Sequence, residues 1–246
     1  MQQVFVEGEI ADGLIIAGED GHHLADVVRL KCGETLRVSD HVGNSFLCEV
    51  AAVEKGRVTI KVLEELQSTE LEGSIILFQA IPKGERMETI IEKCVELGVN
   101  TIVPVTMQNC VVKLEEKKIP AKLKRWQAIA DTAAKQCKRS KMPVVTEPMS
   151  LKAAIAFAAE NEIDVNIVPY ECAEGMEATK KVLSEIKEDS RIAIYIGPEG
   201  GYSPAEIELL SSANGRVVSL GKRILRTDTA AITTVGMVML KKEMGV

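Results

Sequence analysis

The sequence is poor in the residues that build metal sites and disulfide frameworks. Its six cysteines form no C-x-x-C pair, and scattered cysteines of this kind are typical of free buried thiols rather than of disulfides or zinc ligands. All three histidines, His22, His23 and His41, lie within the first 41 residues. A site further along the chain therefore has no local histidine as a general base or metal ligand, and we expect no metal site.

Long hydrophobic runs and the common nucleotide-binding motifs are also missing. The longest late uncharged run, Thr229 to Leu240, is too short to span a bilayer, and the amino terminus has no basic region followed by an apolar stretch. There is no G-x-x-x-x-G-K-[ST], G-x-G-x-x-G or G-x-S-x-G, which argues against P-loop ATP hydrolysis, ordinary dinucleotide binding and a serine nucleophile elbow. We expect a cytoplasmic protein without a membrane partner.

Charge is unevenly distributed along the 246 residues. The net charge of −6 argues against indiscriminate nucleic-acid binding, and residues 1–72 hold 6 Lys and Arg against 14 Asp and Glu. Residues 113–141 hold 10 Lys and Arg against 3 Asp and Glu. This local excess of positive charge, which the net charge of the chain conceals, is typical of a nucleic-acid-binding surface. The alternative for this basic stretch is a solvated helix face.

The pattern of apolar residues changes near residue 70, which predicts two domains, 1–70 and 73–246. The first contains short β-rich runs and one helical piece over 22–30, and it suggests a small barrel. The second alternates strands with helices, which predicts a mostly parallel sheet covered on both faces. Its expected strands are 75–80, 101–105, 144–145, 165–168, 192–196 and 217–220, and its expected helices are 85–97, 121–139, 151–160, 176–186, 204–213 and one from 227.

Two loops near the carboxyl end carry the strongest signal for a ligand. Gly197-Pro198-Glu199-Gly200-Gly201 follows an apolar strand, and open α/β sheets bind ligands at the carboxyl ends of their strands. Ser203 to Glu206 fits a capping box that starts a helix. In the second loop Lys222, Arg223 and Arg226 alternate with apolar residues, a mixture suited to an apolar ring pocket edged by cations.

The helix expected from Thr227 is apolar on every side until Lys241-Lys242. A helix of this kind must be buried all round, and a subunit interface is the simplest way for a terminal helix to achieve that. Burial inside the monomer is the alternative.

Several motifs together resemble the SPOUT methyltransferases, specifically the ribosomal RNA small subunit methyltransferase E family, over nearly the whole chain. The resemblance rests on the two loops in order and on four further segments: His22-His23-Leu24 with Val28-Arg29-Leu30 and Gly33; Pro82 to Glu88; Lys93 with Glu96 to Val99; and Ala134 to Arg139. A departure occurs at Gln3-Val4-Phe5, where family members often have an arginine beside aromatic residues, and this puts an amino-terminal RNA contact in question.

The resemblance implies an α/β protein with an N-terminal PUA-like β-barrel and a SPOUT domain with a C-terminal trefoil knot, acting as a homodimer on 16S rRNA in the small ribosomal subunit. The reaction would move the methyl group of S-adenosyl-L-methionine to N3 of a uridine. The expected cofactor-binding residues come from three strand ends and the start of the last helix: Val168, Pro169, Ile196, Gly197, Pro198, Glu199, Gly200, Leu220, Gly221, Ile224, Leu225, Arg226, Thr229 and Ala230.

Removing the N3 proton of uracil leaves a negative charge spread over two carbonyl oxygens, which cations would stabilise. We expect Arg226 to do this, with Arg223 second. The proton acceptor would be Glu199, Asp228 or water, although Glu199 would equally serve as a turn carboxylate that accepts backbone hydrogen bonds. The expected RNA contacts are Arg29, Lys83, Arg86, Lys135, Lys138 and Arg139.

Two other functions stay open at this point. A SPOUT enzyme could methylate another RNA position such as a ribose 2′-hydroxyl, although the matches in the first domain and around Lys83 speak against it. A ribosome assembly factor that binds RNA without catalysis is disfavoured because both cofactor loops are intact.

Overall fold

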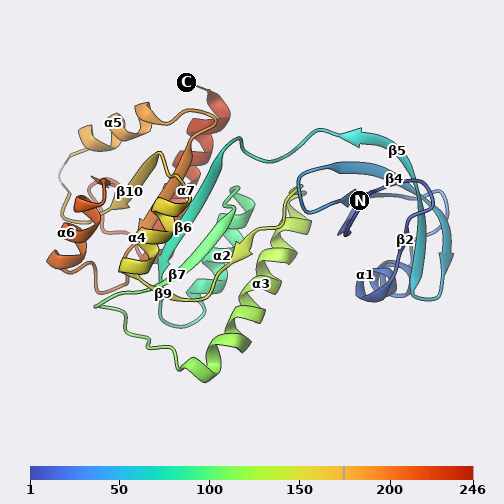
Figure 1. Ribbon diagram of the computed structural model, residues 1–246, viewed down its shortest axis with the longest axis horizontal. Helices are drawn as coiled ribbons and strands as arrows, with labels where there is room; N and C mark the ends of the chain where they lie inside the picture. Colours follow the sequence, from blue (N-terminus) through green and yellow to red (C-terminus); the bar gives the residue numbers. More distant parts are fainter. Residues whose placement is uncertain (174, 246) are drawn as a thin grey trace. The chain divides into compact units, whose positions relative to one another are not determined.

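The computed structural model describes residues 1–173 and 175–245, and its contacts divide the chain into two compact units (Figure 1). The first unit holds Met1–Glu70 together with Ala134–Met142, and the second holds Leu71–Ala133 and Pro143–Val246. The basic segment Ala134–Met142, which the sequence pattern assigns to the second domain, is therefore packed into the first unit.

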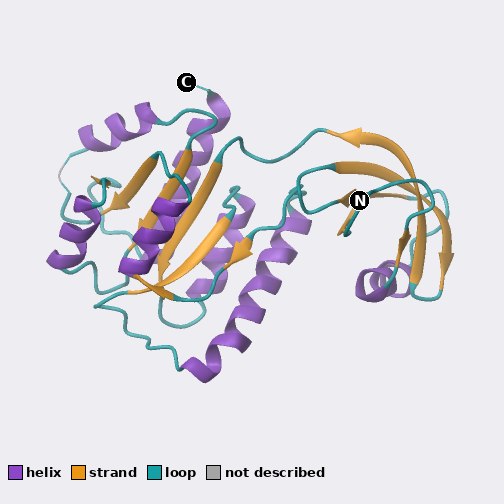
Figure 2. Cartoon of the chain, viewed as in Figure 1, coloured by secondary structure: helices purple, strands orange, loops and turns teal. Residues whose placement is uncertain are grey.

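The first unit is built on one five-stranded sheet (Figure 2). Its strands are β1 (Gln2–Phe5), β2 (Ile15–Ile16), β3 (Thr35–Ser39), β4 (Ser45–Glu54) and β5 (Arg57–Leu66), in the order β1-β3-β4-β5-β2. Only the β1–β3 pair is parallel. The first and last strands of this order are not paired with each other, so the expected barrel is a half-barrel.

A short helical segment covers the apolar face of this sheet. It consists of α1 (Gly18–His22) and the π-helix η1 (His23–Val28), so it starts and ends earlier than the expected 22–30. The helix stops because Arg29 adopts a left-handed conformation with φ of 60°. Leu24, fully buried, packs with Leu36, Val50 and Ile60 to form the core of the unit.

The second unit contains a sheet in which every strand pair is parallel, as the alternation of strands and helices predicts. Its main order is β12-β10-β11-β6-β7-β8, with β9 also pairing β7. The strands are β6 (Ser74–Ala80), β7 (Thr101–Thr106), β8 (Val144–Val145), β9 (Met149–Ser150), β10 (Val165–Pro169), β11 (Arg191–Ile196) and β12 (Gly215–Val218).

Helices cover both faces of this sheet. They are α2 (Arg86–Glu96), η2 (Glu116–Lys118), α3 (Ile119–Gln136), α4 (Leu151–Glu160), α5 (Glu177–Glu185), α6 (Pro204–Ser212) and α7 (Thr227–Met244). Phe78 and Tyr195 stack at 4.6 Å between ring centroids on the face that packs against α4 and α6. Because successive strand residues alternate, Leu77 and Ile194 are buried on the opposite face, where α7 packs against β6, β11 and α2.

Many boundaries in the second unit differ from the expected ones by one to three residues, most clearly in α3 and β12, and one strand was not expected. Helix α3 ends at Gln136 rather than at Arg139, because Lys138 takes a left-handed φ of 66°. Strand β12 runs from Gly215 to Val218 rather than over 217–220, and its earlier end leaves Leu220 in the following loop. Strand β9 has two residues and was not expected from the pattern.

The terminal helix α7 is not buried on all sides by its own chain. Ala231, Thr234, Val235 and Val238 face the interior, whereas Leu240 on the other face is 54% exposed. Within the described part of the chain, every helix is too short or too polar to span a bilayer.

Candidate cofactor pocket

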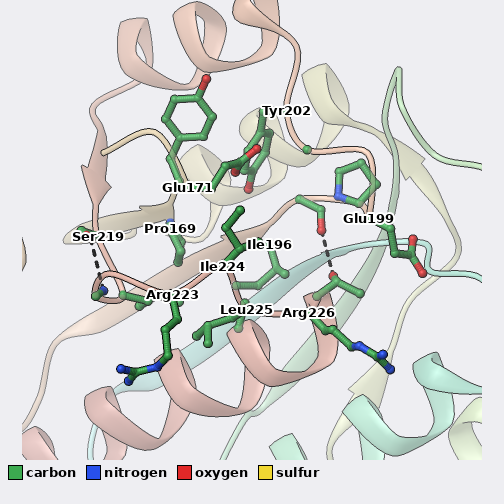
Figure 3. A pocket seen from close by; sticks show the side chains of 18 of the residues that line it. Pro169, Glu171, Ile196, Glu199, Tyr202, Ser219, Arg223, Ile224, Leu225 and Arg226 are labelled. Carbon is green, nitrogen blue, oxygen red and sulfur yellow. Dashed lines mark hydrogen bonds between the residues drawn. The ribbon is translucent and has the colours of Figure 1, made fainter. Parts of the chain in front are cut away.

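A cavity of about 480 Å³ lies where the carboxyl ends of three adjacent strands meet. The loops after β10, β11 and β12 form its walls, and the first turn of α7 contributes Thr227 and Ala230 (Figure 3). Strand β10 lies between β11 and β12, so these three loops are brought side by side by the sheet order. Both the place and the size are those of small-molecule sites in α/β proteins.

The turn after β11 can be built only with glycine at several positions. A β-carbon on Gly197 would come within 2.9 Å of the Tyr202 ring, and Gly201 has a left-handed φ of 70°. Asn109 fixes the turn from outside, because its Nδ2 donates to the carbonyls of Gly200 at 3.2 Å and Gly201 at 3.0 Å. Backbone groups are thereby exposed to a ligand.

The helix after this turn begins as expected. The Ser203 side chain accepts a hydrogen bond from the backbone N–H of Glu206, the Glu206 carboxylate accepts from the N–H of Ser203, and Pro204 occupies the first turn. The predicted capping box is confirmed, and it fixes the direction in which the chain leaves the pocket.

Glu199 points away from the centre of the pocket towards the start of α2. Its Oε1 accepts a hydrogen bond from the Lys83 backbone N–H at 3.0 Å and from Arg86 Nη1 at 2.6 Å. Burial acts to raise the pKa of the Glu199 carboxyl, but these hydrogen bonds and the Arg86 charge outweigh it, and the pKa is lowered. The carboxylate is held ionised and bound to a cation, which disfavours it as a proton acceptor.

The loop after β12 supplies the cations. Arg223 and Arg226 are exposed, and Figure 3 shows their side chains diverging on the side of the loop opposite Glu171 and Tyr202. Ile224, expected as an apolar wall, lines the pocket but is 87% exposed. Gly221 adopts a φ of 104°, and its N–H donates to Ser219 Oγ at 3.2 Å.

A hydrogen-bonded chain beneath the pocket joins the two signature loops. Gln79 is buried near the carboxyl end of β6, and its Nε2 donates to Thr227 Oγ1 at 2.9 Å. Thr227 Oγ1 in turn donates to the Gly197 carbonyl at 2.8 Å, so the start of α7 is tied to the turn after β11. Because buried hydrogen-bonded groups resist displacement, this chain holds the two loops at a fixed separation.

The third wall follows β10 and contains residues that the sequence analysis did not single out. Tyr170 and Glu171 line the cavity directly after Pro169. Tyr202, on the first loop, donates its hydroxyl to the Tyr195 carbonyl at 2.7 Å. Burial, with a smaller effect from Glu171, raises the pKa of Tyr202 well above its usual value, so the phenol stays neutral.

All but two of the expected cofactor-binding residues line the pocket. Val168 belongs to β10 and is fully buried in the core, and Thr229 is exposed on the outer surface of α7. Neither contributes to the cavity surface. Tyr170 and Glu171 could have been found from their position two and three residues after the predicted strand end at residue 168, whereas nothing local points to Asn109.

The residues fit S-adenosyl-L-methionine. Pro169, Ile196 and Leu225 give an apolar wall of the kind that holds a purine ring, and the glycine-rich loops present backbone groups beside it. Charged side chains of both signs, from Glu171 to Arg226, stand at the edges for the amino-acid end of the molecule. Among the described residues, no group of three or more His, Cys, Asp or Glu side chains could hold a metal ion.

The expected RNA-binding residues differ in how free they are. Arg29 and Lys83 are exposed. Lys135 pairs with Asp20 at 2.8 Å and Lys138 Nζ donates to the Met1 carbonyl at 2.8 Å, while Arg86 is engaged with Glu199.

Arg139 has a structural role. Its side chain is 4% exposed and lies 2.6 Å from the Glu70 carboxylate, whose own side chain is 6% exposed. A phosphate contact would require this buried ion pair to break, at a cost of several kcal/mol.

Comparison with known protein families agrees with this geometry. Residues 69–239 match the RNA methyltransferase domain family, and residues 16–63 match the RNA methyltransferase PUA domain family. The Bacillus subtilis ribosomal RNA small subunit methyltransferase E is 32% identical over 99% of this chain and 98% of its own length.

Two solved structures share the fold. A methyltransferase from Legionella pneumophila, in complex with the bound cofactor SAM, superposes with a TM-score of 0.81 at 31% identity and covers 97% of this chain and 96% of its own. The ribosomal RNA small subunit methyltransferase E of Neisseria gonorrhoeae, bound to S-adenosyl methionine, superposes with a TM-score of 0.82 at 25% identity. The match covers 98% of this chain and 97% of the Neisseria chain. The predicted architecture of a PUA-like domain followed by an α/β methyltransferase domain is confirmed, and the trefoil knot stays a prediction. The chain belongs to the ribosomal RNA small subunit methyltransferase E family.

Proposed function

We propose that this protein transfers the methyl group of S-adenosyl-L-methionine to N3 of a uridine in 16S rRNA of the small ribosomal subunit. The observation that carries the proposal is the pocket itself: the two glycine- and arginine-containing loops of the family meet at one sheet edge, beside an apolar wall. Relatives with this fold are solved with the same cofactor bound.

The donor supplies an electrophilic methyl group, and the chain has to position it and activate the acceptor. Pro169, Ile196 and Leu225 hold the adenine ring, and the turn after β11 presents its backbone groups to the ligand. Fixing both reactants in line accounts for a large part of the rate enhancement expected of such a site.

Arg226 stabilises the charge that develops on the uracil carbonyl oxygens when N3 loses its proton, and Arg223 assists at the other end of the loop. Glu199 keeps the turn and Arg86 in place rather than accepting the proton. The proton passes to solvent, since Asp228 does not line the pocket and its carboxylate accepts a hydrogen bond from the Thr229 backbone N–H at 3.0 Å.

The RNA is contacted by exposed cations, principally Arg29 and Lys83, together with Lys135 in the last turn of α3 and Lys138 in the loop that follows it. Two copies of the chain associate through the outer face of α7, and the protein acts in the cytoplasm. A small ribosomal subunit presents a fixed surface to a protein of net charge −6, so it is a better substrate than free RNA.

The test is to incubate the protein with S-adenosyl-L-methionine and small subunits that lack the modification, and to analyse the digested nucleosides by mass spectrometry. We expect new N3-methyluridine. Arg226→Ala should lower the rate by about 10² to 10³, because a charge-stabilising donor is lost. Arg216→Ala, an exposed arginine on β12 outside the pocket, is the matched control and should keep the rate.

Another methylated nucleoside, such as a 2′-O-methylated one, would keep the cofactor and overturn the proposed target. Cofactor binding without methylation of any subunit preparation would favour a non-catalytic assembly factor.

A further inference from the structure

Glu171 is a pocket-lining carboxylate that the proposed chemistry does not use. It lies two residues beyond the end of β10, and Figure 3 shows it beside Tyr202 on the side of the cavity opposite Arg223 and Arg226. The Glu171 carboxylate lies against Gly201 of the loop after β11. A β-carbon on Gly201 would collide with Oε1 of Glu171, so the second glycine of the Gly200-Gly201 pair leaves room for this carboxylate.

Glu171 is exposed to solvent, and its carboxylate lines the pocket. Among residues 1–173 and 175–245, no N–H or O–H group donates a hydrogen bond to this carboxylate, and no cation pairs with it. The other carboxylate of the pocket, Glu199, is neutralised by Arg86 at 2.6 Å. Of the two carboxylates that line the pocket, Glu171 is therefore the one whose charge is available to a ligand.

The lining cations all come from another wall. Lys222, Arg223 and Arg226 belong to the loop after β12, whereas Glu171 belongs to the loop after β10. A pocket with one anionic edge and one cationic edge is complementary to a zwitterion. The amino-acid end of S-adenosyl-L-methionine is such a group, with an ammonium and a carboxylate on one carbon.

We infer that Glu171 binds the ammonium group of the methionine part of the donor and so fixes the orientation of the cofactor in the pocket. This inference rests on the proposed function. Glu171 is a positioning residue for the cofactor and takes no part in the transfer of the methyl group.

The ammonium is a better partner for this carboxylate than the sulfonium. Methyl transfer turns the sulfonium into a neutral thioether, so a carboxylate beside the sulfur would stabilise the bound donor more than the transition state and would slow the reaction. The ammonium keeps its charge throughout. A contact to it strengthens binding of donor, transition state and product alike.

Titration calorimetry with three ligands tests the assignment on the full-length protein. S-adenosyl-L-methionine has the ammonium and the sulfonium, S-adenosylhomocysteine keeps only the ammonium, and 5′-methylthioadenosine lacks both but keeps the adenine and ribose. Glu171→Gln should weaken the binding of S-adenosyl-L-methionine and of S-adenosylhomocysteine by the same factor. That factor should be about tenfold, as expected for the loss of a partly solvated charge-assisted hydrogen bond. The same substitution should leave the affinity for 5′-methylthioadenosine unchanged.

Glu177→Gln is the matched control, because it removes one negative charge from the start of α5, outside the pocket, where Glu177 pairs with Lys180. It should bind all three ligands like the wild type. Glu171→Asp, which keeps the charge on a shorter side chain, should bind the two ammonium-bearing ligands more tightly than Glu171→Gln does. An unchanged thermal midpoint of Glu171→Gln without ligand shows that the variant folds.

Several results would overturn the inference. If Glu171→Gln bound all three ligands more weakly by the same factor, Glu171 would contact the ribose. If only the binding of S-adenosyl-L-methionine were weaker, Glu171 would lie at the sulfur. Wild-type affinity of Glu171→Gln for every ligand would remove it from the binding site. If the wild-type protein bound none of the three, the proposed function itself would fail and the inference with it.

Discussion

The Glu199 carboxylate accepts hydrogen bonds from Lys83 N and Arg86 Nη1, and this arrangement lowers its pKa. A carboxyl group with a lowered pKa is ionised throughout the neutral range, so its titration cannot produce an activity change there. Its role is to hold the turn after β11 against the start of α2. The amide of glutamine can accept the same two hydrogen bonds, whereas alanine cannot.

We therefore predict that Glu199→Gln keeps the methyl-transfer rate within about tenfold of the wild type and that Glu199→Ala loses more. The pH dependence of kcat between about pH 6 and 9 should have the same shape in Glu199→Gln as in the wild type. Single-turnover rates across that range measure both quantities. Loss of an acidic limb in the glutamine variant would instead identify Glu199 as the base.

Among the loops, Gly201 shows how one missing side chain shapes the pocket. Its φ of 70° is strained for any residue with a β-carbon, and that β-carbon would also press on Glu171. Gly13 has a comparable φ of 84° with open space around it. The two glycines therefore separate backbone strain from the steric effect on the pocket.

We predict that Gly201→Ala and Gly13→Ala both lower the free energy of unfolding by about 1 to 2 kcal/mol through backbone strain. Only Gly201→Ala should also weaken the binding of S-adenosyl-L-methionine, because it displaces the Glu171 carboxylate. Urea unfolding measures the free energy of unfolding, and titration calorimetry measures the affinity for S-adenosyl-L-methionine. Equal cofactor affinity in both variants would show that Gly201 matters for the turn alone.

The elements that could be predicted from the sequence are those with local start and stop signals. Helix α4 was predicted at its observed bounds, because Ser150 caps it by accepting a hydrogen bond from the Ala153 N–H at 3.3 Å. The residue pattern predicts strands over 46–50 and 58–62, whereas β4 continues to Glu54 and β5 to Leu66. The extra residues join the sheet through cross-strand partners that no local pattern reveals, as when Glu64 pairs with Leu47 and Glu54 with Arg57.

The same limit applies to the pocket. Its two loops carry short distinctive motifs and were predictable, and Glu171 follows a strand end that was also predictable. The contacts that hold the loops come from Asn109 and Gln79, which are distant in sequence and have no motif of their own. Arg139 is buried because it pairs with Glu70, which is 69 residues away in the sequence. The burial of Arg139 could therefore not be inferred from the basic stretch alone.

The segment Ala134–Met142 is attached to the first unit by a buried polar cluster. Arg139 pairs with Glu70, and Glu70 Oε1 also accepts hydrogen bonds from the backbone N–H groups of Ser140 at 2.8 Å and Lys141 at 3.0 Å. Burial acts to raise the pKa of Glu70, but the Arg139 hydrogen bond and charge and the two backbone hydrogen bonds outweigh it, so the pKa is lowered.

A lowered folded-state pKa means that this stabilisation is complete above the ordinary pKa of about 4.5 and is lost as the pH falls through the folded value. We predict that Glu70→Gln destabilises the first unit by about 3 to 5 kcal/mol at neutral pH, because a buried arginine loses its counter-ion. Glu70→Gln should also reduce the loss of unfolding free energy that the wild type shows as the pH falls. Native-state hydrogen exchange of β3 to β5 measures this, with exposed Glu65→Gln as the control; equal effects of the two variants would contradict the prediction.

At the scale of the whole molecule, α7 presents two different faces. Ala231, Thr234, Val235 and Val238 are buried against the helix's own chain. Thr233, Gly236, Met237 and Leu240 recur at helical spacing on the opposite side and are at least partly exposed. An uncharged stripe that includes the largely exposed Leu240 is suited to packing against a second copy of the same helix, because the small residues allow close approach.

We predict that the protein is a dimer and that Leu240→Lys converts it to a monomer, since two lysines would have to be buried near the symmetry axis without partners. Sedimentation velocity gives the masses. Leu209→Lys, which places the same charge on the 40% exposed leucine of α6, should stay dimeric. Both variants keep the buried face of α7, so each should retain the wild-type thermal midpoint when extrapolated to low protein concentration. A dimer of unchanged stability in Leu240→Lys would mean that the outer face of α7 is solvated and that association, if any, uses another surface.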